Sequence, residues 1–248
     1  MPEITLERAI TTLVNPYNLI AAVYMLLMLA AWWSARFWQT PDFVRRRAIF
    51  LSPRWTVLLQ KRFRSPFMDK FTSIVWFWGF TFTIFAMWAI CLFQGERAWR
   101  IGVVVLGTVS TSLLLQALFP VVVPIRYPDF GKPMEGFEQI RFQVSERSGS
   151  IYGSDIVNGL LYNGVPSNHF GMMLVGAFIC LQINWYDPWL GWWLGALMFA
   201  LIASVFAFSV IYLGEHYPLD MVASAIVYPI GITVFNIILE AIIPFPAS

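Results

Sequence analysis

Long runs of apolar residues without charge alternate with polar segments along this chain. A helix of about 20 apolar residues is long enough to cross the hydrocarbon core of a bilayer. Backbone groups in lipid must form hydrogen bonds within their own segment, so each run is predicted to be a helix. The predicted transmembrane helices are 16–37, 71–93, 101–119, 167–183, 189–213 and 221–239.

The composition agrees with a membrane protein. Of the 248 residues, 58% are hydrophobic and 12% are charged, whereas soluble domains carry about 45–50% apolar and about 25% charged residues. Several of the 12 Trp residues stand near the ends of the apolar runs, as in proteins with aromatic belts at the membrane interface. We therefore expect residues 1–248 to form one all-α integral membrane domain, a bundle of about six transmembrane helices.

Two connections between the predicted helices are long. Residues 38–70 form a basic interfacial loop with eight Lys or Arg residues and two Asp residues, and residues 120–166 form a loop rich in Gly, Pro and charge. Long loops in compact proteins tend to be functional. With six helices, both loops and the turn after Leu213 lie on one side of the membrane, opposite to the termini. We expect the active site at that face.

The start of the fourth predicted helix has a sequence typical of an anion site. Pro166 suits the first turn of a helix, and Ser167 and Asn168 can cap free backbone N–H groups. A helix N-terminus also attracts anions through its N–H groups and its dipole. His169 in this position could donate a proton to a leaving oxygen.

A second polar group surrounds the junction of the fifth and sixth helices. Ser209 and His216 are seven residues apart, about two helical turns. Pro218 disfavours a continuous helix there, so Asp220 falls in the first turn of the sixth helix. An Asp four residues after a His can hold one ring nitrogen, which fixes the tautomer and leaves the other nitrogen as a nucleophile.

Arg126, after the third helix, is a candidate phosphate clamp because a guanidinium binds two phosphate oxygens at once. Each candidate also has a plainer interpretation, as an interfacial His, an Arg that reaches toward water or an Asp at a helix dipole. The combination favours function. The only two His residues, an Asp and an Arg are all predicted at one face, and polar residues within membranes are usually functional.

These residues resemble the type 2 phosphatidic acid phosphatase superfamily. Its Pro-Ser-Gly-His motif is matched from Pro166 to His169, with Asn in place of Gly. Its next motif is matched in spacing by Ser209, His216 and Asp220. The resemblance implies that His216 forms a phosphohistidine, that Asp220 orients it, and that His169 protonates the leaving oxygen. It implies no metal or other cofactor. The residues implied to bind the substrate phosphate are Arg126, Ser167, Asn168 and Ser209.

Departures from the superfamily pattern bear on the substrate. Val210 stands where the resemblance predicts Arg, and Phe119 stands where it predicts Lys. A phosphate monoester carries nearly two negative charges and a diester carries one, so two missing cations weaken the case for monoester hydrolysis. Residues 209–220 are also similar to the branch of inositol phosphorylceramide and sphingomyelin synthases, which move a head group between lipids.

Three functions therefore stay open. A lipid phosphate phosphatase is expected first, because phosphatases are the commoner members of the superfamily. A phospholipid head-group transferase is the alternative. A non-catalytic lipid binder or transporter is the third, although such a protein has no need of the intact set of His169, His216 and Asp220.

The expected partners are a membrane lipid substrate and the bilayer itself, with no nucleic acid. The superfamily usually carries its site on the extracytoplasmic face, and we expect the same of this multi-pass protein. The distribution of charge opposes that orientation. The two loops on the site face hold twelve Lys or Arg residues and the opposite face holds three, whereas basic loops usually face the cytoplasm.

Overall fold

The computed structural model describes residues 7, 10–11, 14–38, 54–94, 98–118, 120–124, 136–140, 143, 162–164, 166–186 and 188–242. Within these residues the chain forms seven α-helices and two short β-strands. In chain order they are α2 (Pro16–Trp38), α4 (Arg54–Phe63), α5 (Pro66–Phe93), α6 (Ala98–Leu118), β1 (Pro120–Val122), β2 (Tyr162–Gly164), α9 (Asn168–Tyr186), α10 (Leu190–Leu213) and α11 (Pro218–Ile242).

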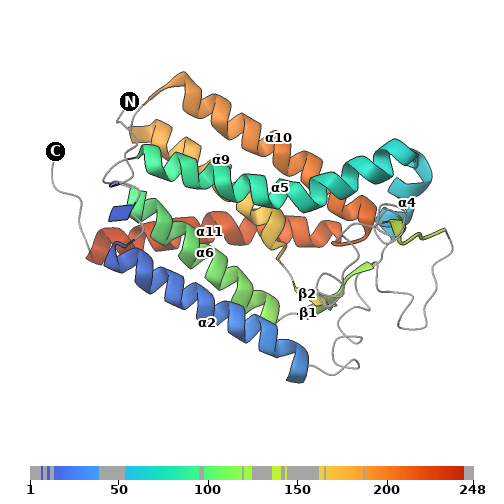
Figure 1. The fold of residues 1–248 in the computed structure, drawn as a ribbon, viewed down its shortest axis with the longest axis horizontal. Coiled ribbons are helices and arrows are strands. Elements are labelled where there is room, and N and C mark those ends of the chain that lie inside the picture. Colours follow the sequence, from blue (N-terminus) through green and yellow to red (C-terminus); the bar gives the residue numbers. More distant parts are fainter. Residues whose placement is uncertain are drawn as a thin grey trace.

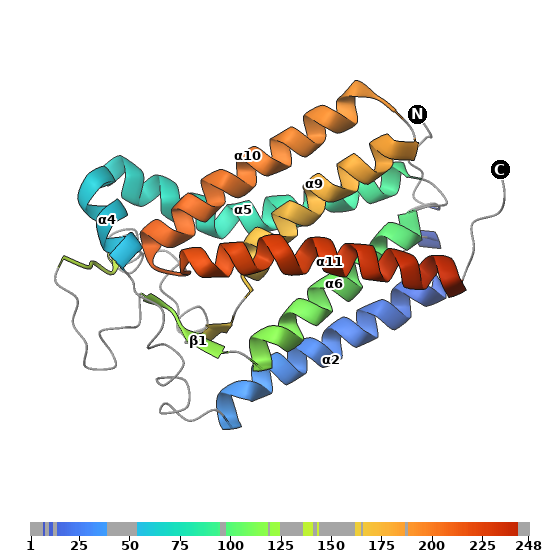
Figure 2. The ribbon, with the colours of Figure 1, turned by 180° about the vertical axis from the view of Figure 1, so that it is seen from behind.

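The six long helices form a bundle, and the short helix α4 lies at one end of it (Figure 1). α2 packs on α6, α6 on α11, and α11 on α9, while α10 packs on both α9 and α5. The two strands lie at the same end as α4, whereas the start of α2 and the end of α11 lie at the opposite end (Figure 2). The described parts of the two long connections, α4 and the two strands, therefore lie at one end of the bundle.

A helix occupies each of the six segments predicted to cross the membrane. By length and composition, three helices in the described part of the chain can span a bilayer. They are α6, α10 and α11. α5 is a fourth if its two parts, Pro66–Gly79 and Thr81–Ile90, are counted as one bent span. In α2, the apolar part is the shorter Pro16–Ala31.

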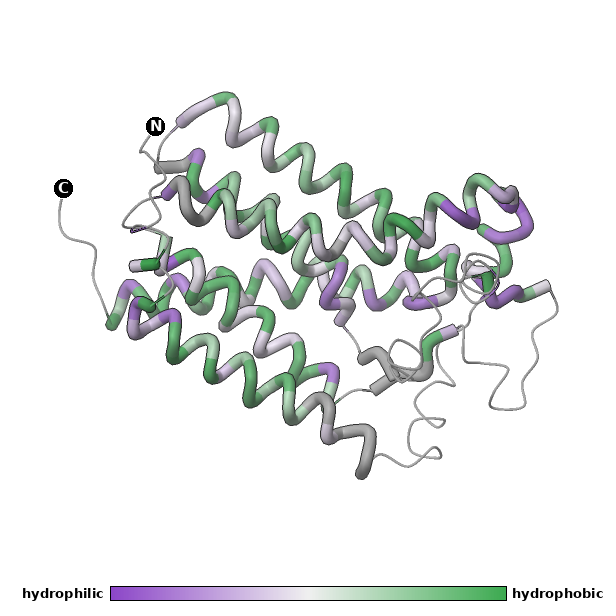
Figure 3. The backbone as a smooth tube through the Cα atoms, in the orientation of Figure 1, coloured by the Kyte–Doolittle hydropathy of each residue, from purple (hydrophilic) through white to green (hydrophobic). Residues whose placement is uncertain are grey.

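The outward faces of the long helices are apolar. Large side chains that the bundle leaves exposed include Phe85 on α5, Leu190 and Leu201 on α10, and Ile230 and Ile237 on α11. Figure 3 shows long apolar stretches along these helices and polar residues at α4 and the start of α5. Soluble monomers rarely expose apolar areas of this extent, so these faces suit contact with lipid.

A two-stranded antiparallel sheet is an addition to the predicted all-α architecture. β1 follows α6 and pairs with β2, with Pro120 opposite Gly164. The end of α6 and the start of α9 lie close together, since Nε2 of Gln116 donates to the carbonyl of Pro166 at 2.6 Å. The two ends of the 120–166 loop therefore meet. Pro120 fits in β1 because proline has no N–H to donate, and both strands of a two-stranded sheet are edge strands.

Glycines let α6 and α9 each approach α11 closely. Gly171 on α9 lies against the ring of Tyr228 on α11, and Gly107 on α6 lies against the ring of Phe235 on α11. A side chain at either glycine would collide with the facing ring. Small residues have this role in helix packing within membranes, and here they bring α6, α9 and α11 together around polar groups.

Candidate active site

A tight turn between α10 and α11 carries His216. Gly214 ends α10 with φ 78° and ψ 23°, a left-handed conformation that glycine adopts without steric cost. The N–H of Glu215 then donates to the carbonyl of Val210 at 2.8 Å, a frequent way of closing a helix. Pro218 begins α11, so the turn that holds His216 is fixed at both ends by helices.

His216 and Asp220 form a buried pair. Nδ1 of His216 lies 3.0 Å from Oδ2 of Asp220, and the two side chains are 1% and 4% exposed. The N–H of Tyr217 donates to the same oxygen at 2.9 Å. A carboxylate only accepts hydrogen bonds, so Nδ1 of a neutral His216 carries the proton and Nε2 keeps its lone pair. The pairing that the i, i+4 spacing predicted is present.

Ser167 connects the start of α9 to the start of α11. Its N–H donates to the carbonyl of Asp220 at 3.4 Å. Oγ of Ser224 lies within hydrogen-bond distance of both the Ser167 carbonyl (2.9 Å) and the Asp220 carbonyl (2.7 Å). Oγ of Ser167 accepts from the N–H of Phe170 at 3.4 Å, as a helix cap does. The two sequence motifs are therefore held together through their backbones.

The two histidines, far apart in the sequence, are neighbours in the fold. The ring centroids of His169 and His216 are 6.2 Å apart, with an angle of 63° between the rings. The ring of His169 also stacks on Phe206, at 5.7 Å and 22°. This stacking holds one imidazole beside the other, so both rings lie close enough to contact one substrate group.

The side chain of Asn168 belongs to a polar network between α6, α9 and α11. Its Oδ1 accepts from Tyr228 Oη at 2.8 Å and from Oγ of Ser112. Its Nδ2 donates to Oε1 of Gln116 at 3.1 Å. The network anchors the first residue of α9, next to His169. Both ends of the Asn168 amide contact protein groups.

Ser209 and Val210 lie in the last turns of α10 and are both fully buried. Oγ of Ser209 donates to the carbonyl of Val205 at 2.8 Å, one turn earlier in the same helix. Val210 packs in an apolar cluster with Met173 and Phe206. The resemblance predicts an Arg at position 210. In the structure this position is part of the apolar core beside His169.

The comparisons with known proteins decide the family. The sequence model of the PAP2 superfamily matches residues 50–234, most of the chain. The chain belongs to the PAP2 superfamily. No curated protein and no solved structure shows a significant match. The superfamily predicted from the two motifs is confirmed. Its members are phosphatases or phosphotransferases, which supports an enzyme acting on phosphate esters, and together with the apolar helices it supports an integral membrane protein.

The cations of this PAP2 protein are unevenly distributed. The sequence has no Lys or Arg after Arg147, so α9, α10 and α11 contribute histidines and a carboxylate but no permanent positive charge. Arg126, the predicted phosphate clamp, lies outside the described residues. Within the described residues, no group of three or more His, Cys, Asp or Glu side chains is arranged to hold a metal ion.

Sequence reasoning missed the groups that hold the site in place. Ser112, Gln116 and Tyr228 surround Asn168, and Ser224 joins the two motifs. A signal for two of them was available, because Ser112 and Gln116 are polar residues four apart in an apolar run and therefore share one helix face. Nothing in the local sequence pairs them with α9.

Proposed function

We propose that this protein is a membrane-embedded enzyme that hydrolyses a lipid phosphate through a phosphohistidine on His216. The observation that carries the proposal is the buried pair of His216 and Asp220, with Nδ1 and Oδ2 3.0 Å apart, beside the ring of His169 at 6.2 Å. An interfacial His does not require a buried carboxylate on one nitrogen and a second imidazole beside its ring. Titratable groups clustered in this way are typical of catalytic sites.

The proposed reaction has two steps. Nε2 of His216 attacks phosphorus, the bond from phosphorus to the lipid oxygen breaks, and His169 gives a proton to that oxygen. A water molecule then loses a proton to His169 and attacks the phosphohistidine, which releases inorganic phosphate and restores His216. Asp220 stabilises the positive charge that the His216 ring acquires in the first step. No step requires a metal ion. The proposed phosphate contacts are Arg126, Ser167, Asn168 and Ser209.

For the membrane arrangement, we propose that all six long helices cross the bilayer. The polar connections, α4 and the site then lie at one face, and the chain termini lie at the other. We place the site on the extracytoplasmic face by analogy with the superfamily. The twelve basic residues of the two loops oppose that choice. The test is to place single cysteines in residues 38–53 and to label them from outside in sealed cells.

One observation favours a second candidate, a phospholipid head-group transferase of the inositol phosphorylceramide or sphingomyelin synthase kind. Val210 is buried in an apolar cluster, and no Lys or Arg follows Arg147. A site with few cations suits a phosphodiester, which carries one negative charge. The first step would then be the same, and an acceptor lipid alcohol would replace water in the second.

The deciding experiment uses the purified protein in lipid nanodiscs. It is supplied in turn with a lipid phosphate monoester, and with a phosphodiester lipid together with an acceptor lipid alcohol. Free phosphate and transferred head group are both measured, and His216→Gln is the inactive control. Release of phosphate from the monoester supports the phosphatase, and transfer without free phosphate supports the transferase. Lipid binding without either product contradicts both enzyme functions and supports a non-catalytic lipid binder.

A further inference from the structure

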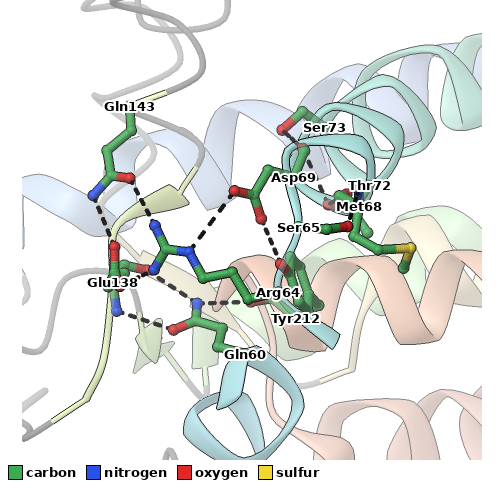
Figure 4. A network of polar contacts seen from close by, with 10 residues as sticks. All are labelled: Gln60, Arg64, Ser65, Met68, Asp69, Thr72, Ser73, Glu138, Gln143 and Tyr212. Atoms are coloured by element: carbon green, nitrogen blue, oxygen red, sulfur yellow. Dashed lines mark hydrogen bonds and ion pairs between the residues drawn. The ribbon is translucent and has the colours of Figure 1, made fainter. Parts of the chain in front are cut away.

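A hydrogen-bond network with a buried centre joins distant parts of the chain next to the turn that carries His216 (Figure 4). Its centre is Gln60 on α4, which is 2% exposed. Nε2 of Gln60 donates to the carbonyl of Tyr212 at 2.9 Å and to the carbonyl of Glu138 at 3.0 Å. Its Oε1 accepts from the N–H of Glu138 at 3.0 Å. Both N–H groups of this amide and its oxygen are therefore used.

Side chains around Gln60 extend the network. The carboxylate of Glu138 pairs with Arg64 and accepts from Nε2 of Gln143 at 3.3 Å. The hydroxyl of Tyr212 donates to Oδ1 of Asp69 at 2.5 Å. As Figure 4 shows, α4, the start of α5, Glu138 and Gln143 are all linked to the end of α10 in this way.

The place of Tyr212 in α10 gives these contacts a consequence for the site. The last four carbonyls of a helix have no partner within the helix, and the carbonyl of Tyr212 is one of them. Gln60 supplies the partner for it. Gly214 turns the chain two residues later, and His216 follows. A displacement of this last turn would therefore move His216 relative to Asp220 and His169.

We infer that Gln60 and Tyr212 are positioning residues, which act through the last turn of α10 to hold His216 in its reactive orientation. This inference rests on the proposed function. The absence of Lys and Arg after Arg147 adds to its weight, because any cation of the chain that reaches the substrate phosphate comes from the region before that residue. Gln60 fastens part of that region, through Glu138, to the turn of His216.

The kinetic test compares Gln60→Leu with Gln182→Leu in nanodiscs. Gln182 accepts a hydrogen bond from Nδ2 of Asn236 at 3.3 Å, so the control makes the same substitution between α9 and α11, toward the other end of the bundle. Two quantities are measured for each variant: the rate of phosphoenzyme formation at saturating substrate and the thermal unfolding midpoint. Small misplacements of reacting groups cost up to about a hundredfold in rate. We expect a ten- to hundredfold loss of this rate in Gln60→Leu alone, measured at a temperature where both variants are folded. The unfolding midpoint should be lower in Gln60→Leu, because it loses three hydrogen bonds and Gln182→Leu loses one.

A second readout does not depend on activity. Amide hydrogen exchange of peptides covering residues 209–220 should become faster in Gln60→Leu and stay unchanged in Gln182→Leu. Unchanged exchange in Gln60→Leu, or equal rates of phosphoenzyme formation in the two variants, overturns the inference. If the wild type forms no phosphoenzyme, the proposed function fails, and exchange still decides whether Gln60 holds the turn. If Gln60→Leu does not fold, Tyr212→Phe, which loses only the bond to Asp69, takes its place with the same two readouts.

Discussion

Oδ2 of Asp220 lies 3.0 Å from Nδ1 of His216, and both side chains are almost completely buried. The other carboxylate oxygen, Oδ1, is buried with no hydrogen-bond partner in the described part of the structure. A buried carboxylate that is only partly paired is unfavourable for stability. Such a group is better explained by a role in orienting and charging His216 than by a role in holding two helices together.

Asp220→Asn should lower turnover without abolishing it. The amide removes the negative charge that stabilises the positive imidazole, and it can force His216 into the wrong tautomer. The comparable change in the Ser-His-Asp triad costs about ten-thousandfold in rate, and we expect a loss of about a hundredfold or more here. The measurement is the steady-state rate, with Glu240→Gln at the far end of α11 as the matched control. A rate equal to that of the control would assign Asp220 to helix capping.

Asn168→Ala should destabilise the protein and slow the reaction together. The hydroxyls of Ser112 and Tyr228 and Oε1 of Gln116 lose Asn168 as a partner, and a buried polar group without a partner costs about 1–3 kcal/mol. The start of α9, with His169, then loses these side-chain bonds to α6 and α11 and keeps the one from Gln116 to the carbonyl of Pro166. Thermal unfolding midpoints and rates are compared with those of Asn236→Ala. This control removes one hydrogen bond, the one from Asn236 to Gln182 at 3.3 Å. Hydrogen bonds between helices in membranes contribute about 0.6 kcal/mol on average.

A fall in stability without a fall in rate would show that the Asn168 network serves folding alone. A fall in rate with an unchanged unfolding midpoint would instead agree with a direct contact between Asn168 and the substrate phosphate.

Gly214→Ala should strain the turn of His216. Gly214 has φ 78°, and a side chain in the left-handed region costs about 1–2 kcal/mol. The control is Gly195→Ala in the second turn of the same helix, where Ala is favoured over Gly by about 1 kcal/mol and the added Cβ would lie 3.1 Å from Sγ of Cys180. We expect a lower unfolding midpoint and a lower rate for Gly214→Ala only. Equal behaviour of the two variants would argue against a required left-handed residue at this position.

Turnover should be insensitive to metal chelators. In the proposed reaction the nucleophile is an imidazole, and the proton for the leaving oxygen comes from His169, so each step is complete without a metal ion. The rate after dialysis against a strong chelator should equal the rate before it. A loss of activity that added divalent cations restore would contradict this mechanism.

The positions of the long helices could be predicted from the sequence, because uncharged apolar runs have few alternatives in a membrane. The pairing of His216 with Asp220 was also predictable, since it depends on a spacing within one turn of chain. The resemblance of two short motifs was enough for the superfamily, which the match over residues 50–234 confirms.

Contacts between distant segments could not be predicted from a single sequence. Gln60 meets Tyr212 and Glu138 across 152 and 78 residues of chain, and nothing in the local pattern of α4 indicates either partner. Asn168 was predicted as a phosphate contact from its place in a motif, whereas its observed partners come from α6 and α11. The roles of Ser167, Ser209 and Arg126 stay predictions, and Arg126 lies outside the described residues.

The central claim is that His216 becomes phosphorylated. The most direct measurement mixes the protein in nanodiscs with a lipid substrate labelled at phosphorus and quenches the reaction at alkaline pH, where phosphohistidine persists. Peptide mapping then locates the label. We predict label on the peptide that contains His216 in the wild type, none in His216→Gln, and a slower appearance in Asp220→Asn. Turnover of the same substrate without label on that peptide, or equal labelling of His216→Gln, would contradict the account.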